Sequence, residues 1–180
     1  MKMVHYSMLL LLLLVSTSLM GQTKKQKKEK KFVQKNEAYK ATKKLIDSGN
    51  YLFDAQTTNS PSINQGVISL ESRKNSVIVK EEVVELNLPY FGVASSYGYG
   101  YNNSNPGISF KGIPAEYNVK HIDKKRRSVI KINVTSSMER HDITLTVNYR
   151  RKTEVKVISS SRQSVSFSGY IMPLTINSNN

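Results

Sequence analysis

The spacing of apolar and polar residues changes once along the chain, near Gly49. Before it, apolar side chains recur at helical intervals, at Ala38, Ala41 and Leu45, and a short polar stretch then supplies a helix stop. This spacing predicts one N-terminal amphipathic helix over about residues 32–48. Beyond Gly49 the period is two, which is typical of half-buried β-strands.

The alternation is clearest where Ile143, Leu145 and Val147 are separated by polar residues. Short strands that are joined by turns, with no helices between them, favour a closed or nearly closed antiparallel sheet. The sequence therefore predicts a mainly β fold, a single antiparallel β-barrel or half-barrel. The expected strands cover about residues 51–56, 67–71, 76–79, 84–88, 108–111, 128–134, 142–149, 154–159 and 165–171.

Residues 1–21 have the build of a secretory signal peptide. Lys2 precedes an apolar run, Met8–Val15, of about eight residues, and small polar residues follow it. The run is shorter than the roughly 18 residues that cross a bilayer. We therefore expect cleavage near Gly21, with Ser18 as the alternative, export to the periplasm or the extracellular space, and no transmembrane segment in the mature protein. Because the chain contains no cysteine, a lipidated N-terminus, disulfides and thiolate metal sites are excluded.

Charge divides the remaining chain into parts. Residues 22–31 are lysine-rich and predicted to form a flexible arm, residues 32–175 form a single β-rich domain, and residues 176–180 form a polar tail. The sequence carries 27 Lys and Arg against 13 Asp and Glu, a net charge of +14. Such a field attracts polyanions. Solubility alone is the alternative explanation.

In a meander of antiparallel strands, every second connection lies at the same end of the sheet. We call this hairpin parity, and it is expected to bring two basic segments together. If the strands at 128–134, 142–149 and 154–159 form a meander, the connections before the first and after the second lie at one end of the sheet. Clustered cations there would bind a multivalent anion better than scattered ones. The alternative is two solvated turns whose like charges point apart. We call these seven residues the basic rim: Lys124, Lys125, Arg126, Arg127, Arg150, Arg151 and Lys152.

Tyrosines and glycines alternate at residues 97–101, within an aromatic segment between residues 89 and 107. Flat amphipathic rings on a free backbone are typical of recognition loops. We therefore expect this segment to line the barrel interior or mouth and to hold a small apolar or glycan-like ligand, with an arginine orienting a polar group. Tyrosines that fold back to cover the mouth are the alternative. The candidate residues are Tyr90, Phe91, Tyr97, Tyr99, Tyr101 and Arg162.

Residue types for catalysis or metal binding form no recognisable set. His121 and His141 stand beside acids, but the sequence identifies no third ligand and no serine partner for either. Nucleophile-elbow, phosphate-loop and zinc-protease motifs are absent. We therefore expect no enzyme, no cofactor and no metal. Nucleic acid is not an expected partner, because an exported protein seldom meets it, and the oligomeric state stays open.

Four segments follow one another along the chain: Phe53–Thr57, Leu88–Gly92, Gly107–Phe110 and Ser161–Gly169. Together they resemble the domain-of-unknown-function family 4251 (DUF4251), over about residues 35–172. The resemblance implies an exported protein of Bacteroidetes-type bacteria, with a compact lipocalin-like β fold and no assigned activity. This chain departs from the family pattern at Val93, where a basic residue is usual, and in its tyrosine- and glycine-rich insertion.

Two functions are expected. The first is a non-enzymatic binding module for a small apolar or glycan-like ligand. The alternative is a cell-envelope interaction protein that binds anionic surfaces or polyanions through the basic rim.

Overall fold

The computed structural model describes residues 2–59, 66–71, 74–90, 107–136 and 139–174, with side chains from Lys24 onward. The chain forms two compact units, Met1–Ala38 and Tyr39–Asn180. One helix, α1, spans Lys2–Asp47; the first unit is helical from Lys2, and the second contains the last residues of α1 and all the strands.

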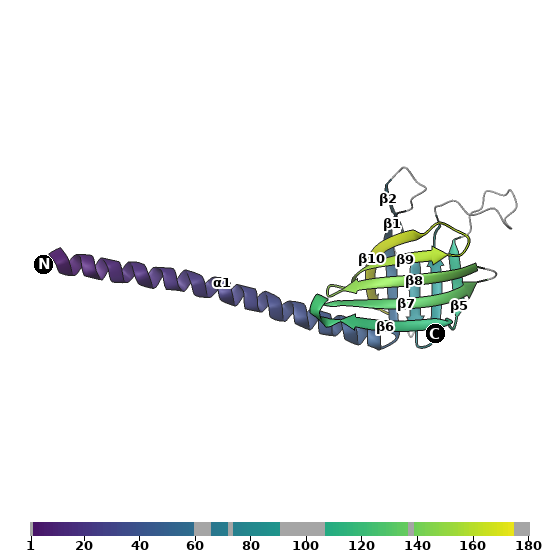
Figure 1. The fold of residues 1–180 in the computed structure, drawn as a ribbon, viewed down its shortest axis with the longest axis horizontal. Helices are drawn as coiled ribbons and strands as arrows, with labels where there is room; N and C mark the ends of the chain where they lie inside the picture. The colour runs from purple at the N-terminus through teal and green to yellow at the C-terminus, as the bar shows by residue number, and fades with distance from the viewer. Residues whose placement is uncertain (1, 60–65, 72–73, 91–106, 137–138, 175–180) are drawn as a thin grey trace, which may run out of the picture. The chain divides into compact units, whose positions relative to one another are not determined.

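The second unit is built on one ten-stranded sheet in which neighbouring strands are antiparallel. The strand order is β5-β4-β3-β1-β10-β9-β8-β7-β6, and β2 pairs with β1 outside this path. Figure 1 shows β6, β7 and β8 crossing the direction of β1 and β5, so the sheet curls into a half-barrel. The strands are β1 (Asn50–Asn59), β2 (Val67–Ser69), β3 (Ser76–Lys80), β4 (Val83–Leu88), β5 (Ile108–Gly112), β6 (Glu116–Ile122), β7 (Arg127–Ser136), β8 (Glu139–Asn148), β9 (Lys152–Ser159) and β10 (Val165–Pro173).

Alternate side chains of the strands form the core. In β8, Ile143, Leu145 and Val147 are buried, whereas Thr144 and Thr146 between them are partly exposed. Side chains from both halves of the sheet join one apolar cluster. Fully burying a Leu or Ile side chain stabilises the fold by about 1.5–3 kcal/mol. The interior of the half-barrel is therefore occupied by the protein's own side chains.

The last residues of α1 pack across one end of the strands. Ile46 joins the core cluster, and Tyr39 and Thr42 are buried. The Tyr39 hydroxyl donates to the Asp123 carboxylate at 2.8 Å, and the Thr42 hydroxyl donates to the Tyr149 carbonyl at 3.3 Å. These contacts fix the helix against the turns that follow β6 and β8.

The helix is longer than its prediction. It begins at Lys2 instead of about residue 32, so the lysine-rich residues 22–31, expected as a flexible arm, are helical. Lysine, glutamine and glutamate are good helix formers and need no apolar stripe for that purpose. The prediction relied on apolar spacing and therefore placed the start too late. Signal-peptide cleavage near Gly21 stays a prediction.

One strand, β6, is absent from the predicted set. It lies at the edge of the sheet, and residues 116–118 and Lys120 are exposed. An edge strand with a weakly apolar inner face gives a faint period-two pattern. The fold class itself, a mainly antiparallel half-barrel with one N-terminal helix, is as predicted.

Candidate functional site

The basic rim is assembled at one end of the half-barrel, the end covered by the last residues of α1. Arg127 begins β7 and pairs with Asn148 at the end of β8. Arg127 also pairs with Ile122, which precedes the 3-10 turn η1 (Asp123–Lys125). The β6–β7 and β8–β9 turns therefore lie side by side, as hairpin parity predicts, and the strand register brings their seven cations to the same end.

Each of the two turns holds an arginine in the left-handed backbone region. The φ angle is 47° at Arg126 and 65° at Arg151. A left-handed conformation costs a non-glycine residue roughly 1–2 kcal/mol. The second turn is held by Asn148, whose side-chain oxygen accepts from the N–H groups of Arg150 at 2.8 Å and Lys152 at 3.2 Å.

The acidic residue of the first rim turn, Asp123, is already bonded to α1. Asp123 accepts from Tyr39 and lies 3.2 Å from Lys43, and these two hydrogen bonds lower the pKa of its carboxyl group. Burial, followed by the same Asp123 contact, raises the pKa of Tyr39 to about 12. Asp123 is thus engaged by the helix.

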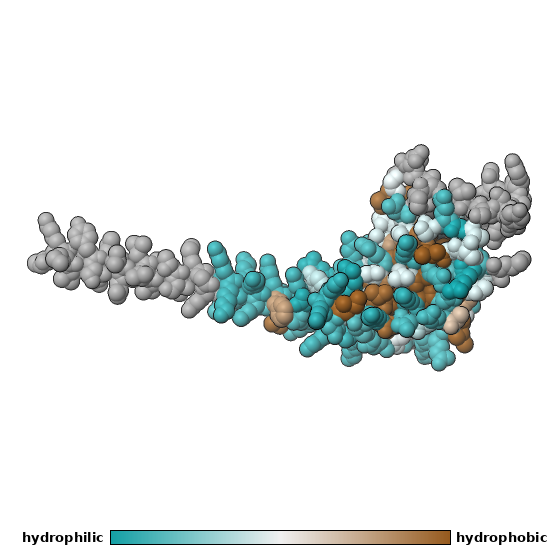
Figure 2. Space-filling model, viewed as in Figure 1, coloured by the Kyte–Doolittle hydropathy of each residue, from teal (hydrophilic) through white to brown (hydrophobic). Residues whose placement is uncertain are grey.

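The exposed cations of the rim have no such partner. Within the described ranges of the chain, the side chains of Lys124, Lys125, Arg127 and Lys152 form no ion pair, whereas Arg150 lies 5.4 Å from the Tyr149 ring centroid. Figure 2 shows a largely hydrophilic surface over the strands, broken by separate hydrophobic patches.

The opposite end holds the two described residues of the expected ligand site. Tyr90, just after β4, is 5% exposed, and the Arg162 guanidinium lies 5.1 Å from its ring centroid. The contact joins two of the segments that carry the family resemblance, Leu88–Gly92 and Ser161–Gly169. The other candidates in this set lie outside the described residues: Phe91, Tyr97, Tyr99 and Tyr101.

Arg162 belongs to a buried group that we call the ionic cluster: Glu139, His141 and Arg162. Arg162 Nε lies 2.8 Å from Glu139 Oε2, and the two side chains are only 4% and 9% exposed. Glu139 also accepts from the Ser161 hydroxyl, at 2.5 Å. His141 Nδ1 is 2.8 Å from the Ser159 hydroxyl. The cluster ties the connection after β9 to the start of β8.

The surroundings lower the pKa of the histidine in this cluster. Burial chiefly lowers the pKa of His141, with a smaller effect of the same sign from Arg162 and an opposing one from Glu139. Sequence reasoning missed Glu139, because a lone glutamate at the start of a strand gives no sign that an arginine from the β9–β10 connection will pack against it.

The other histidine serves helix packing. His121 Nε2 lies 2.8 Å from the Asp47 carboxylate of α1, and Nδ1 lies 2.8 Å from the Ser128 hydroxyl. Across the described part of the chain, no three His, Cys, Asp or Glu side chains are placed to hold a metal ion. Among the same residues, no helix has the length and apolarity needed to cross a membrane.

Comparison with known proteins gives the family context. A family model described as "Domain of unknown function (DUF4251)" matches residues 33–171. The crystal structure of a DUF4251 family protein from Bacteroides eggerthii DSM 20697 is similar to this chain, with a TM-score of 0.55 and 16% identity. The similarity covers 76% of this chain and 87% of that one, and at this identity it bears on the fold alone. No curated protein matches.

Proposed function

The chain belongs to the DUF4251 family, and we propose that this member is an exported, non-enzymatic protein that binds anionic surfaces or polyanions through its basic rim. The observation that carries the proposal is the pairing of Arg127 with Asn148, which sets two basic turns at one end of the sheet. Several cations on these adjacent turns form no ion pair with any residue that the structure describes, so they present a multivalent positive surface.

The left-handed arginines support the same function. At Arg126 and Arg151, glycine would adopt the observed φ at lower cost, and an arginine there keeps a cation at the tip of each turn. Strain of this kind is often retained where the side chain has a task outside the fold.

The filled interior also favours the rim over an internal ligand. Tyr51, Phe53 and Phe167 belong to the same core cluster as Ile130 and Ile143 from the other half of the sheet. A ligand inside the half-barrel would have to displace such side chains, at a cost in packing.

The test compares two sets of three lysines in the full chain. The first variant replaces Lys124, Lys125 and Lys152 of the rim by Gln, and the control replaces Lys74, Lys111 and Lys131 by Gln, so that both lose the same charge. We expect the rim variant to bind heparin about 10–100-fold more weakly at 0.1 M salt, with a shallower salt dependence. We expect the control to bind within about threefold of the wild type.

Vesicles provide the second probe. Wild type should sediment with vesicles that contain anionic phospholipid and not with neutral ones, and the rim variant should sediment less. Equal losses in the two lysine variants, or none in either, would overturn the proposal.

A second candidate function is the binding of a small apolar or glycan-like ligand at the mouth beside Tyr90. The position of the Arg162 guanidinium over this ring favours it, since a cation stacked on tyrosine is a common element of binding sites. The test replaces Tyr97, Tyr99 and Tyr101 by Ala. Thermal stabilisation by maltotriose or by a medium-chain fatty acid should be lost while the melting temperature of the free protein is unchanged. Wild-type protein that neither probe stabilises would contradict this candidate.

A further inference from the structure

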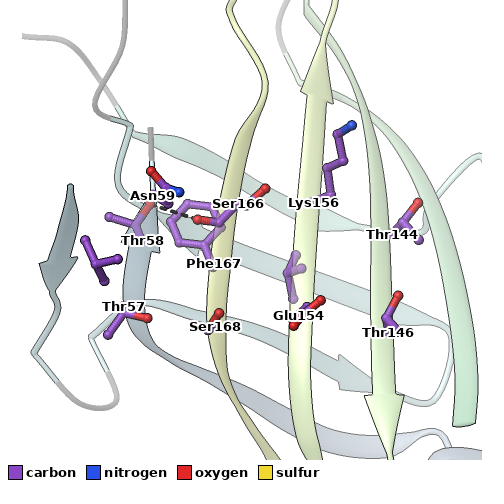
Figure 3. Close-up of a pocket in the computed structure, with 12 residues that line it drawn as sticks. Thr57, Thr58, Asn59, Thr144, Thr146, Glu154, Lys156, Ser166, Phe167 and Ser168 are labelled. Carbon is purple, nitrogen blue, oxygen red and sulfur yellow. Dashed lines mark hydrogen bonds between the residues drawn. The ribbon is translucent and has the colours of Figure 1, made fainter. Parts of the chain in front are cut away.

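The outer face of the sheet contains a hollow. It lies over β1, β8, β9 and β10, and β2 contributes to one side (Figure 3). Its volume is about 510 Å³, within the range of small-molecule binding sites. We call it the outer hollow.

The strand register arranges its polar side chains in two rows. Alternation directs these residues outward, because their neighbours along each strand belong to the core. Each row has a charged residue of β9 between a threonine of β8 and a serine of β10. The rows are Thr144, Lys156 and Ser166, and then Thr146, Glu154 and Ser168.

These side chains are available to a ligand. Among the residues that the structure describes, none of the six side chains makes a hydrogen bond or an ion pair, and Lys156 and Glu154 do not pair with each other. The four hydroxyls can each donate and accept, the ammonium only donates, and the carboxylate only accepts. In Figure 3 they project from three adjacent strands around one space.

The mixture of groups selects the ligand class. An apolar ligand would leave the charged and hydroxyl groups desolvated without partners, which is costly. A uniformly anionic polymer would meet the Glu154 carboxylate. A neutral saccharide offers many hydroxyls that both donate and accept, and Val67 of β2, 66% exposed, gives its C–H face an apolar contact.

We propose that the outer hollow is a binding site for a neutral oligosaccharide chain, with Glu154 and Lys156 each contacting sugar hydroxyls between flanking threonine and serine side chains. The site contains no residue of the basic rim and is independent of the polyanion function. Because its groups are partly solvated, binding should be weak, with a Kd of about 0.1–1 mM.

The test titrates the isotopically labelled full chain with maltotriose, cellotriose and triacetylchitotriose and follows backbone amide shifts by NMR. At least one trisaccharide should shift amides of residues 144–146, 154–156 and 166–168 in a saturable manner. In the double variant Thr144→Val and Thr146→Val, which keeps the β-branched shape, the affinity should fall at least about tenfold. Glu154→Gln should also weaken binding, by about threefold or more.

The matched control is Thr135→Val, on the exposed outer face of β7 and outside the hollow, which should bind as the wild type does. Melting temperatures of all variants check that the fold is kept. Absence of saturable shifts with all three trisaccharides, or equal affinity in the double valine variant and the wild type, would overturn the proposal.

Discussion

The two ends of the half-barrel use charge in opposite ways. At the end that carries the basic rim, the cations lie on turns, and most are exposed. At the other end, Arg162 and Glu139 are buried against each other and engage Tyr90 and Ser161. Exposed charges contribute little to folding and stay available to a partner, whereas a buried ion pair is costly to break because the remaining charge is left without its partner. The contrast supports the proposal that the rim binds a partner and that the ionic cluster supports the fold.

The largest effect should come from breaking the buried pair. Arg162→Met leaves the Glu139 carboxylate buried without its cation, so the free energy of unfolding should fall by about 3–5 kcal/mol. Urea unfolding followed by circular dichroism measures it.

Arg140 provides the matched control, because it pairs with Asp142 at 3.2 Å on the exposed face of β8. Arg140→Met should cost less than about 1 kcal/mol. Equal losses in the two variants would contradict the assignment of a structural role to the ionic cluster. Adding Glu139→Leu to Arg162→Met should recover part of the stability, since no buried charge then remains unpaired.

The lysines of the rim should show the reverse pattern. Replacing Lys124, Lys125 and Lys152 by Gln should leave the free energy of unfolding within about 0.5 kcal/mol of the wild type, because these side chains have no partner to lose among the described residues. The same variant should lose heparin affinity. A fall of several kcal/mol in the free energy of unfolding would mean that the rim lysines stabilise the fold, and would contradict this prediction.

A third comparison separates turn strain from binding at a single residue. Arg151→Gly should raise the free energy of unfolding by about 0.5–1 kcal/mol, because glycine adopts φ of 65° without strain. It should also weaken heparin binding, so the two effects have opposite signs. Glu81, with φ of 57° in the β3–β4 turn, is the control. Glu81→Gly should give the same gain in stability with no loss of binding; unchanged binding in Arg151→Gly would remove this arginine from the site.

The smallest expected effect is a pH dependence of the free energy of unfolding that comes from His141 of the ionic cluster. The native pKa of His141 lies below its ordinary value of 6.5, so the unfolded chain binds a proton at higher pH than the native protein does. The contribution of neutral His141 to the free energy of unfolding is fully present above about pH 6.5 and is lost as the pH falls through the native pKa. His141→Gln should therefore flatten the decline in unfolding free energy between pH 7 and pH 5. If the slope of unfolding free energy against pH is the same in His141→Gln and the wild type, protonation of His141 does not contribute to the decline between pH 7 and pH 5.

Sequence patterns predicted local and short-range features well. The alternation in β8 and β10 gives their inner faces directly, and parity alone places Arg127 near Asn148. The edge strand β6 was not predicted, because its exposed residues weaken the alternation of apolar and polar positions. The helical state of residues 22–31 was not predicted because helix propensity, and not an apolar stripe, favours the helix there.

The two polar sites that were missed depend on the arrangement of separate strands. Glu139 meets Arg162 only because the connection after β9 folds over the start of β8. The outer hollow appears only once three strands are set in register, with Glu154 opposite both Thr146 and Ser168. Neither the ionic cluster nor the outer hollow produces a periodic pattern in the sequence from which it could be predicted.

The most direct test of the basic rim is a map of where a polyanion contacts the protein. A heparin-derived hexasaccharide would be titrated into the isotopically labelled chain, with amide shifts followed by NMR at two salt concentrations. We predict saturable shifts centred on residues 123–127 and 149–152 that weaken as salt is raised. Shifts centred instead on Tyr90 and residues 160–164, or spread evenly over all lysine-bearing strands, would contradict the assignment of binding to the rim.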